Sequence, residues 1–257
     1  MKFRQISAVT RLNMHLQLAE PSVQIIMILI PIVMAPFMLP AAKAQLLVQG
    51  YHAANGSEQV VPGLAVLFSF FSVQLIIQNF FNEATYNTWD RLQVSITSLP
   101  EIITGKAIIA YIIQLLQLIA VVLLSSVLFN FSPNGSWLAL AVTLIIFSAC
   151  LTFFGILLVS WTDSASFALM LSNFLGVLMA GLGGSLSPTN SFPDWAQKLA
   201  WFDPAYWALS AIKKISLDHG NLSMIKTNLI ILIIITSLFV LLALLGFKLK
   251  PLKAGDH

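Results

Sequence analysis

Charged residues are scarce in this chain, and cysteine is almost absent. Asp, Glu, Lys and Arg make up 9% of the 257 residues, whereas soluble domains carry about 25%. The single cysteine, Cys150, excludes an intrachain disulfide and a paired-thiol metal or redox motif. The four histidines are scattered and form no metalloprotease-type pair with an intervening acid. The sequence therefore predicts no catalytic residue and no metal site in this chain.

The sequence also has no phosphate-binding loop. Gly105-Lys106 lacks both the upstream glycine and the following hydroxyl of such a loop, since Ala107 comes next. We therefore expect a non-catalytic chain that binds no cofactor itself. The centres of its long apolar runs carry no Asp, Glu, Lys or Arg, which disfavours an ion-coupled carrier, because such carriers usually need an ionisable group within the membrane.

Apolar residues are abundant instead. They make up 58% of the chain, and the mean hydropathy is +0.88. A membrane-crossing helix needs about 20 predominantly apolar residues. The sequence predicts a single, all-α polytopic membrane domain over residues 1–257. Its six transmembrane helices are expected at about 22–40, 61–81, 102–129, 137–161, 165–186 and 222–247. Pro31, Pro36 and Pro40 should kink or loosen the first span, and 41–60 should form an exposed loop with a turn at Asn55-Gly56.

Basic residues flank the spans unevenly. The formal charge of +3 and the pI near 9.1 do not indicate nucleic acid, because the lysines and arginines lie beside apolar runs. One side of the membrane would hold Lys2, Arg4, Arg11, Arg91, Lys106, Lys248, Lys250 and Lys253. The other side would hold Lys43, Lys198, Lys213, Lys214 and Lys226. The positive-inside rule then places both termini in the cytoplasm of a multi-pass plasma-membrane protein. Residues 1–20 have the spacing of an interfacial elbow helix.

The longest polar interval between two apolar runs is 80–106. At helical period, Tyr86, Trp89, Leu92 or Ile96, and Leu99 fall on one side of a helix over 84–99. This pattern fits an amphipathic helix that anchors a loop in the lipid headgroups, and equally one that docks on a partner.

Glutamines and glycines are the unusual residues within the spans. Five amides could line a translocation path or simply form hydrogen bonds between helices; they are Gln74, Gln78, Asn79, Gln114 and Gln117. Between Gly176 and Gly184, the glycines indicate either close helix packing or local unwinding.

Before the last span, residues 188–215 read as two short amphipathic helices joined at Asp203-Pro204. Neither is long enough to span. Their aromatic residues suit the outer interface, so we expect a re-entrant helical hairpin on the extracellular side.

The polar interval contains Thr88-Trp89-Asp90-Arg91-Leu92, then Ser98-Leu99-Pro100-Glu101-Ile102 and Gly105-Lys106. This order of motifs resembles the loop between the second and third spans of ABC-2 type transporter permeases. Glu83 matches the first acid of the family's pattern there, whereas Thr85 stands for the second acid and Asn87 replaces a glycine. The outer segment carries Ser187-Pro188, a Pro-x-Trp, and Asp203-Pro204 followed by Tyr206.

The resemblance implies roles for both segments. The 84–99 helix would be a cytoplasmic coupling helix that docks on an ATPase through Glu83, Tyr86, Trp89, Asp90, Arg91, Leu92 and Ile96. The outer helices would form an external gate with Trp195, Trp201, Tyr206 and Trp207.

The expected function is that of the permease subunit of a bacterial ABC exporter. Its partners would be an ABC ATPase subunit that binds ATP and Mg²⁺, a second permease chain of the same or a homologous kind, and membrane lipid, but no nucleic acid. The cargo would be hydrophobic or amphipathic, such as a drug, a peptide antibiotic or a lipid-linked molecule, and export would confer antibiotic resistance. The alternative is a membrane scaffold or immunity protein that transports nothing.

Overall fold

The computed structural model describes residues 3–19, 21–85 and 99–249, and every regular element in these ranges is helical. The elements are α1 (Phe3–Ala19), α2 (Ser22–Val48), α3 (Ser57–Thr85), α5 (Leu99–Phe129), α6 (Trp137–Trp161), α7 (Ala165–Leu182), the 3₁₀ turn η1 (Thr189–Ser191), α8 (Asp194–Ala200), α9 (Pro204–Leu217) and α10 (Lys226–Leu249). Six of them, α2, α3, α5, α6, α7 and α10, are long and apolar enough to cross a membrane. The predicted all-α, six-span class is confirmed.

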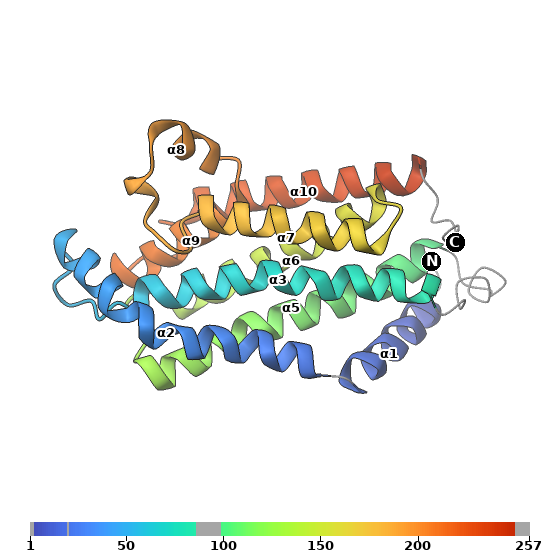
Figure 1. The fold of residues 1–257 in the computed structure, drawn as a ribbon, viewed down its shortest axis with the longest axis horizontal. Helices are drawn as coiled ribbons and strands as arrows, with labels where there is room; N and C mark the ends of the chain where they lie inside the picture. Colours follow the sequence, from blue (N-terminus) through green and yellow to red (C-terminus); the bar gives the residue numbers. More distant parts are fainter. Residues whose placement is uncertain (1–2, 20, 86–98, 250–257) are drawn as a thin grey trace.

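α3 and α6 form the centre of the bundle (Figure 1). In the most apolar stretch of each helix, 78% of the residues of α3 and 67% of those of α6 are buried. The buried share is only 17% for α2 and 22% for each of α7 and α10. Phe70 of α3 packs edge-on against Phe147 and Phe154 of α6, at centroid distances of 6.2 Å. Glycine allows this approach, because a Cβ at Gly155 would lie 3.0 Å from Val73. The peripheral helices therefore keep broad apolar faces for lipid or protein.

The first span is longer than expected. Instead of ending near Pro40, α2 stays helical through all three of its prolines and continues to Val48. Ala42 and Leu46 are buried at i and i+4, on the same side of the helix as buried Ala35. The predicted loop over 41–60 is therefore wrong for most of its length. The turn at Asn55-Gly56 is confirmed, since Gly56 has φ +99° and Asn55 Oδ1 accepts a hydrogen bond from the Ser57 amide at 2.7 Å.

Other boundaries agree more closely with the sequence. α6 begins and ends at the predicted tryptophans. Ser164 caps α7 by accepting from the Phe167 amide at 3.2 Å. α7 ends at Leu182, four residues earlier than expected, and α10 begins at Lys226, four residues later.

One end of the bundle brings three connections together at the end of α9. Tyr51, after α2, donates to Asp218 Oδ1 at 2.9 Å. The Gly135 amide, before α6, donates to the Ile215 carbonyl at 2.9 Å. α1, the end of α3, the start of α5 and the end of α10 lie at the opposite end (Figure 1). We call these the outer end and the terminal end, respectively.

Candidate functional site

The polar interval with the coupling motif runs in sequence from the end of α3 to the start of α5, and these two helix ends lie at the terminal end (Figure 1). Six of its predicted contact residues lie outside the described residues: Tyr86, Trp89, Asp90, Arg91, Leu92 and Ile96. Glu83 belongs to the last turns of α3. The predicted helix over 84–99 stays a prediction, but its two attachment points are α3, which ends at Thr85, and α5, which begins at Leu99.

Lys106 holds the first turns of α5 against the end of α3. It is only 1% exposed, although the sequence suggested a lysine at the membrane surface. Its Nζ donates to the Asn79 carbonyl at 2.7 Å and lies 5.0 Å from the centroid of the Phe80 ring. A buried ammonium requires such partners, because desolvation strongly penalises an unpaired charge.

α1 packs on the same turns of α5. Thr10 Oγ1 donates to the Gly105 carbonyl at 3.4 Å. A Cβ at Gly105 would lie 2.8 Å from Val9 Cγ1, so a larger residue there would displace α1. The start of α5 is therefore fixed on two sides, by α3 and by α1.

The predicted path residues are mostly engaged between helices. Gln114 Nε2 donates to the Ser69 carbonyl at 3.0 Å, and Gln117 accepts from Ser72 Oγ. Gln74 Nε2 donates to Asn173 Oδ1 on α7 at 2.6 Å. These bonds support the structural interpretation of the amides, namely hydrogen bonds between helices.

Gln78 and Asn79 differ from those three amides. Gln78 is exposed, and Asn79 lies with Gln114 at a pocket of about 10 Å³. Such a space accommodates about one water molecule. A role for any of the five amides in translocation stays a prediction.

At the outer end, the two predicted helices are present as α8 and α9, joined through Asp203. The aromatic residues divide into two kinds: Trp195 and Trp201 are exposed, whereas Tyr206 and Trp207 are half-buried. Trp207 Nε1 donates to the Trp201 carbonyl at 2.8 Å and thereby ties α9 to the end of α8. A gating role for these four residues stays a prediction.

Asp203 caps α9 from a buried position. Its Oδ1 accepts from the Ala205 amide at 2.8 Å, while its Oδ2 has no hydrogen-bond partner in the described residues. Burial raises the pKa of the Asp203 carboxyl well above its usual range, and the bond from Ala205 only partly offsets this effect. The sequence identified this residue as a helix junction and missed its burial.

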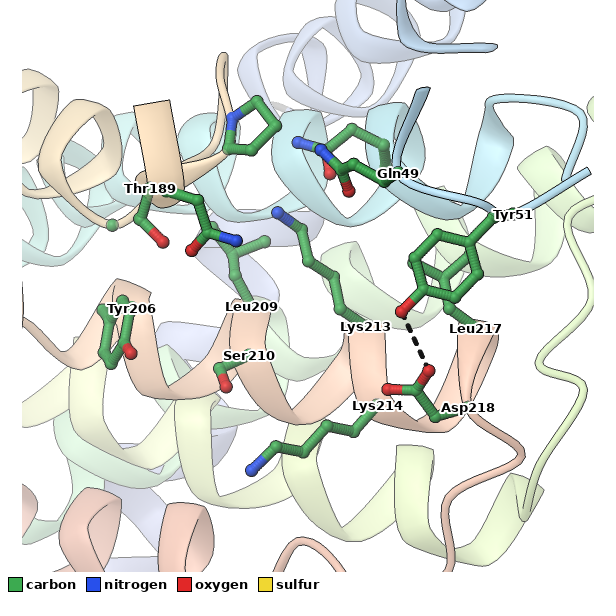
Figure 2. Close-up of a pocket in the computed structure, with 14 residues that line it drawn as sticks. Gln49, Tyr51, Thr189, Tyr206, Leu209, Ser210, Lys213, Lys214, Leu217 and Asp218 are labelled. Atoms are coloured by element: carbon green, nitrogen blue, oxygen red, sulfur yellow. Dashed lines mark hydrogen bonds between the residues drawn. The ribbon is translucent and has the colours of Figure 1, made fainter. Parts of the chain in front are cut away.

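The sequence also missed a polar pocket beside α9. Its lining includes Gln49, Thr189 and Lys213, which come from three separate segments (Figure 2), and also Gln59 of α3. The feature of the sequence that could have indicated this pocket is the Lys213-Lys214 pair, which lies among mainly apolar residues of an amphipathic helix.

Comparison with known proteins agrees with this architecture. Residues 43–245 match the family described as ABC-2 family transporter protein. The chain belongs to the ABC-2 transporter family. The match covers everything from the end of α2 through most of α10, including both motif-bearing segments. The predicted resemblance is thereby confirmed, and the chain is a multi-pass transporter permease.

Two relatives are described as probable multidrug ABC transporter permease YbhR. They come from Escherichia coli strain K12 and from Escherichia coli O157:H7. Each is 26% identical to this chain over 203 residues, which are 76% of this chain and 54% of the relative. The chain thus spans about half the length of these relatives. No solved structure matches it.

Proposed function

We propose that this chain is the membrane subunit of an ATP-driven exporter, and that a separate ABC ATPase docks on the connection between α3 and α5. The observation that carries the proposal is the family match, which includes this motif-bearing connection between two spans. Both attachment points lie at the terminal end (Figure 1). The count of basic residues favours the cytoplasmic side for that end.

The contacts around the start of α5 suggest how the connection would act. Lys106 links α5 to the Asn79 carbonyl of α3, and Thr10 links α1 to the Gly105 carbonyl of α5. Force applied to residues 86–98 would therefore move α3, α5 and α1 together. ATP and Mg²⁺ would act in the partner subunit, and this chain would convert the partner's motion into rearrangement of the spans.

The proposed cargo is a hydrophobic or amphipathic compound, with drugs and peptide antibiotics ranked before lipid-linked molecules. The similar YbhR proteins are described as probable multidrug permeases. The peripheral helices expose apolar faces, and the described amides are mainly engaged between helices. Such surfaces discriminate poorly by hydrogen bonding, which suits a broad range of apolar cargo.

Transport would require a second permease chain. α2 and α7 both pack on α3, and each leaves a largely exposed apolar side. We place the contact between two copies, or between homologous chains, along these helices, with the path between the copies and the outer helices above it.

The function is tested by deleting the gene and by purifying the chain. Deletion should increase sensitivity to at least one class of hydrophobic drug or peptide, and a plasmid-borne copy should restore resistance. The tagged chain should retain an ATPase subunit in mild detergent. If the chain retains no ATPase and deletion changes no sensitivity, the scaffold or immunity role replaces this proposal.

A further inference from the structure

A pocket of about 210 Å³ lies at the outer end, between α9 and the segments that surround it. Polar residues predominate in its wall. The lining residues are Gln49, Tyr51, Gln59, Gly183, Pro188, Thr189, Asn190, Tyr206, Leu209, Ser210, Lys213, Lys214, Leu217 and Asp218. The volume is below the roughly 300–1,000 Å³ of typical drug sites, so the pocket suits a small polar group.

Lys213 supplies an uncompensated positive charge. Its side chain extends from α9 toward the part of the pocket where Gln49 lies (Figure 2). In the described part of the chain, it has neither a hydrogen bond nor an ion pair. Burial lowers the pKa of Lys213 to about 8, because the ammonium loses hydration that nothing replaces. A bound anion would supply the missing interaction.

Gln59 is a second, independent indication of a ligand. It comes from the first turn of α3, lines the same pocket and is only 5% exposed. Its Nε2 has no hydrogen-bond partner among the described residues. Leaving a buried donor unpaired costs about 1–3 kcal/mol. An acceptor in the pocket would satisfy this donor as well as Lys213.

The other ionisable groups of the pocket are already engaged or are neutral. Asp218 accepts from Tyr51 Oη at 2.9 Å, and this bond raises the pKa of Tyr51. Lys214 extends away from α9 in a different direction from Lys213 (Figure 2), and its Nζ donates to Asn228 Oδ1 at 3.0 Å. Tyr206 adds a hydroxyl. Among the described residues, the pocket therefore offers one free cation, Lys213, beside neutral donors and the already engaged Asp218 and Lys214.

We propose that this pocket binds a singly charged phosphodiester, with Lys213 and Gln59 as its principal donors. One cation balances one phosphodiester charge, whereas a doubly charged phosphate monoester would keep an unpaired charge next to Asp218. Hydroxyl and amide groups of Thr189, Asn190 and Ser210 can hold the flanking alcohol groups. The phosphodiester could belong to the headgroup of an anionic phospholipid or to a soluble molecule. Binding depends on neither the direction of transport nor the cargo.

Two measurements on the purified full-length chain distinguish the sources. The first is calorimetric titration with soluble glycerophosphoglycerol in maltoside detergent. The second is retention of phosphatidylglycerol, detected by native mass spectrometry. Binding by either probe alone supports the site and identifies the source, and binding by both supports the site and shows that it accepts either source.

The variants are chosen to leave the fold intact. Lys213→Met keeps most of the length of the side chain but removes its charge, and it should weaken binding at least tenfold. Gln59→Leu should weaken it several-fold. The control Lys198→Met removes an exposed charge of α8 that does not line the pocket, and it should change affinity less than twofold.

The pH dependence provides a separate readout. Because the phosphodiester keeps its single charge, affinity should follow protonation of Lys213. With a pKa of about 8, the apparent Kd should rise about tenfold between pH 7 and pH 9. This change should disappear in Lys213→Met. Failure of both probes to bind, or equal losses in Lys213→Met and Lys198→Met, would overturn the site.

Discussion

Gly63 of α3 lies against the backbone of Ser185, which follows α7 in the chain. A Cβ built on Gly63 would overlap the carbonyl oxygen of Ser185, which is backbone and cannot rotate away. We expect Gly63→Ala to lower the free energy of unfolding by about 1–3 kcal/mol, because overpacking forces backbone shifts. Thermal unfolding of the purified protein in detergent measures the effect.

Gly181 provides the matched control. It is also a helical glycine, but a Cβ there would meet nothing within 4 Å. Gly181→Ala should leave the unfolding temperature unchanged or raise it, since alanine is favoured over glycine in helices by about 1 kcal/mol. Equal unfolding temperatures for the two variants would contradict this assignment of the α3 contact.

Asp203 should make stability depend on pH. The folded state raises the pKa of its carboxyl, so the folded chain holds a proton that the unfolded chain has already lost. Its contribution to stability is fully present below the unfolded pKa of about 4 and is lost as pH rises through the folded pKa. Asp203→Asn is neutral at every pH and keeps a side-chain oxygen for the Ala205 amide.

The measurement compares the unfolding temperatures of wild type and Asp203→Asn from pH 5 to pH 8. The variant should be the more stable protein at pH 8, and the difference should shrink toward pH 5. The comparison isolates Asp203, because all other titrating groups are common to both proteins. Parallel curves would show that the carboxyl is ionised in the folded state across this range.

Among the elements, the helices with clear boundary signals were predicted best. α6 has a tryptophan at each end and a serine cap, and the structure reproduces both of its limits. The first span was predicted to end too early, near residue 40, because Pro40 and Lys43 resemble the end of a helix. The buried positions Ala35, Ala42 and Leu46 hold the helix together past them, and only tertiary packing reveals this.

The contacts of individual site residues were less accessible to sequence reasoning. The sequence placed Gln114 and Gln117 within a span, but it could not show that the groups they contact are Ser69 and Ser72 of α3. The distribution of basic residues placed Lys106 at a membrane surface. It could not show the burial of Lys106, because the Asn79 carbonyl and the Phe80 ring that contact its ammonium lie in another helix. Long-range pairs of this kind leave no local pattern.

For the connection between α3 and α5, we predict that Trp89 is the main anchor on the ATPase. Burying an aromatic anchor at an interface contributes a few kcal/mol, whereas charges at the rim, such as Asp90 and Arg91, contribute much less. Trp89→Ala should release the ATPase or abolish transport-stimulated hydrolysis. Trp195→Ala, which removes an exposed tryptophan from α8 at the outer end, is the control and should retain the ATPase. Unchanged affinity and stimulation in Trp89→Ala would count against this anchor.

For the molecule as a whole, the question is which exposed apolar faces meet lipid and which meet protein. Burial of α3 and α6 accounts for the stability of a single chain, and the peripheral helices are covered mainly on their inner sides. The glycines of α7 indicate how that helix is used: Gly176 packs on Phe70 and Gly183 on Ala205, both within the same chain. The side of α7 left for the proposed second chain is therefore the opposite one, where large side chains such as Phe174 are exposed.

The last prediction is that two copies meet through α2 of one chain and α7 of the other. Both helices pack on α3, and Phe37 is 82% and Phe174 63% exposed, so these sides lack a partner within the described chain.

The test uses paired cysteines in a Cys150→Ala background, where no other thiol remains. Suitable positions are Leu29, Val33 and Phe37 on α2 with Met170, Phe174 and Val177 on α7, all exposed. A disulfide requires Cα atoms within about 7 Å, so at least one pair should yield a covalent dimer on mild oxidation in membranes. Cysteines at the exposed Leu238 and Leu241 of α10 serve as the control and should stay monomeric. Crosslinking through α10 alone would place the second copy on the other side of the bundle and remove the path proposed between α2 and α7.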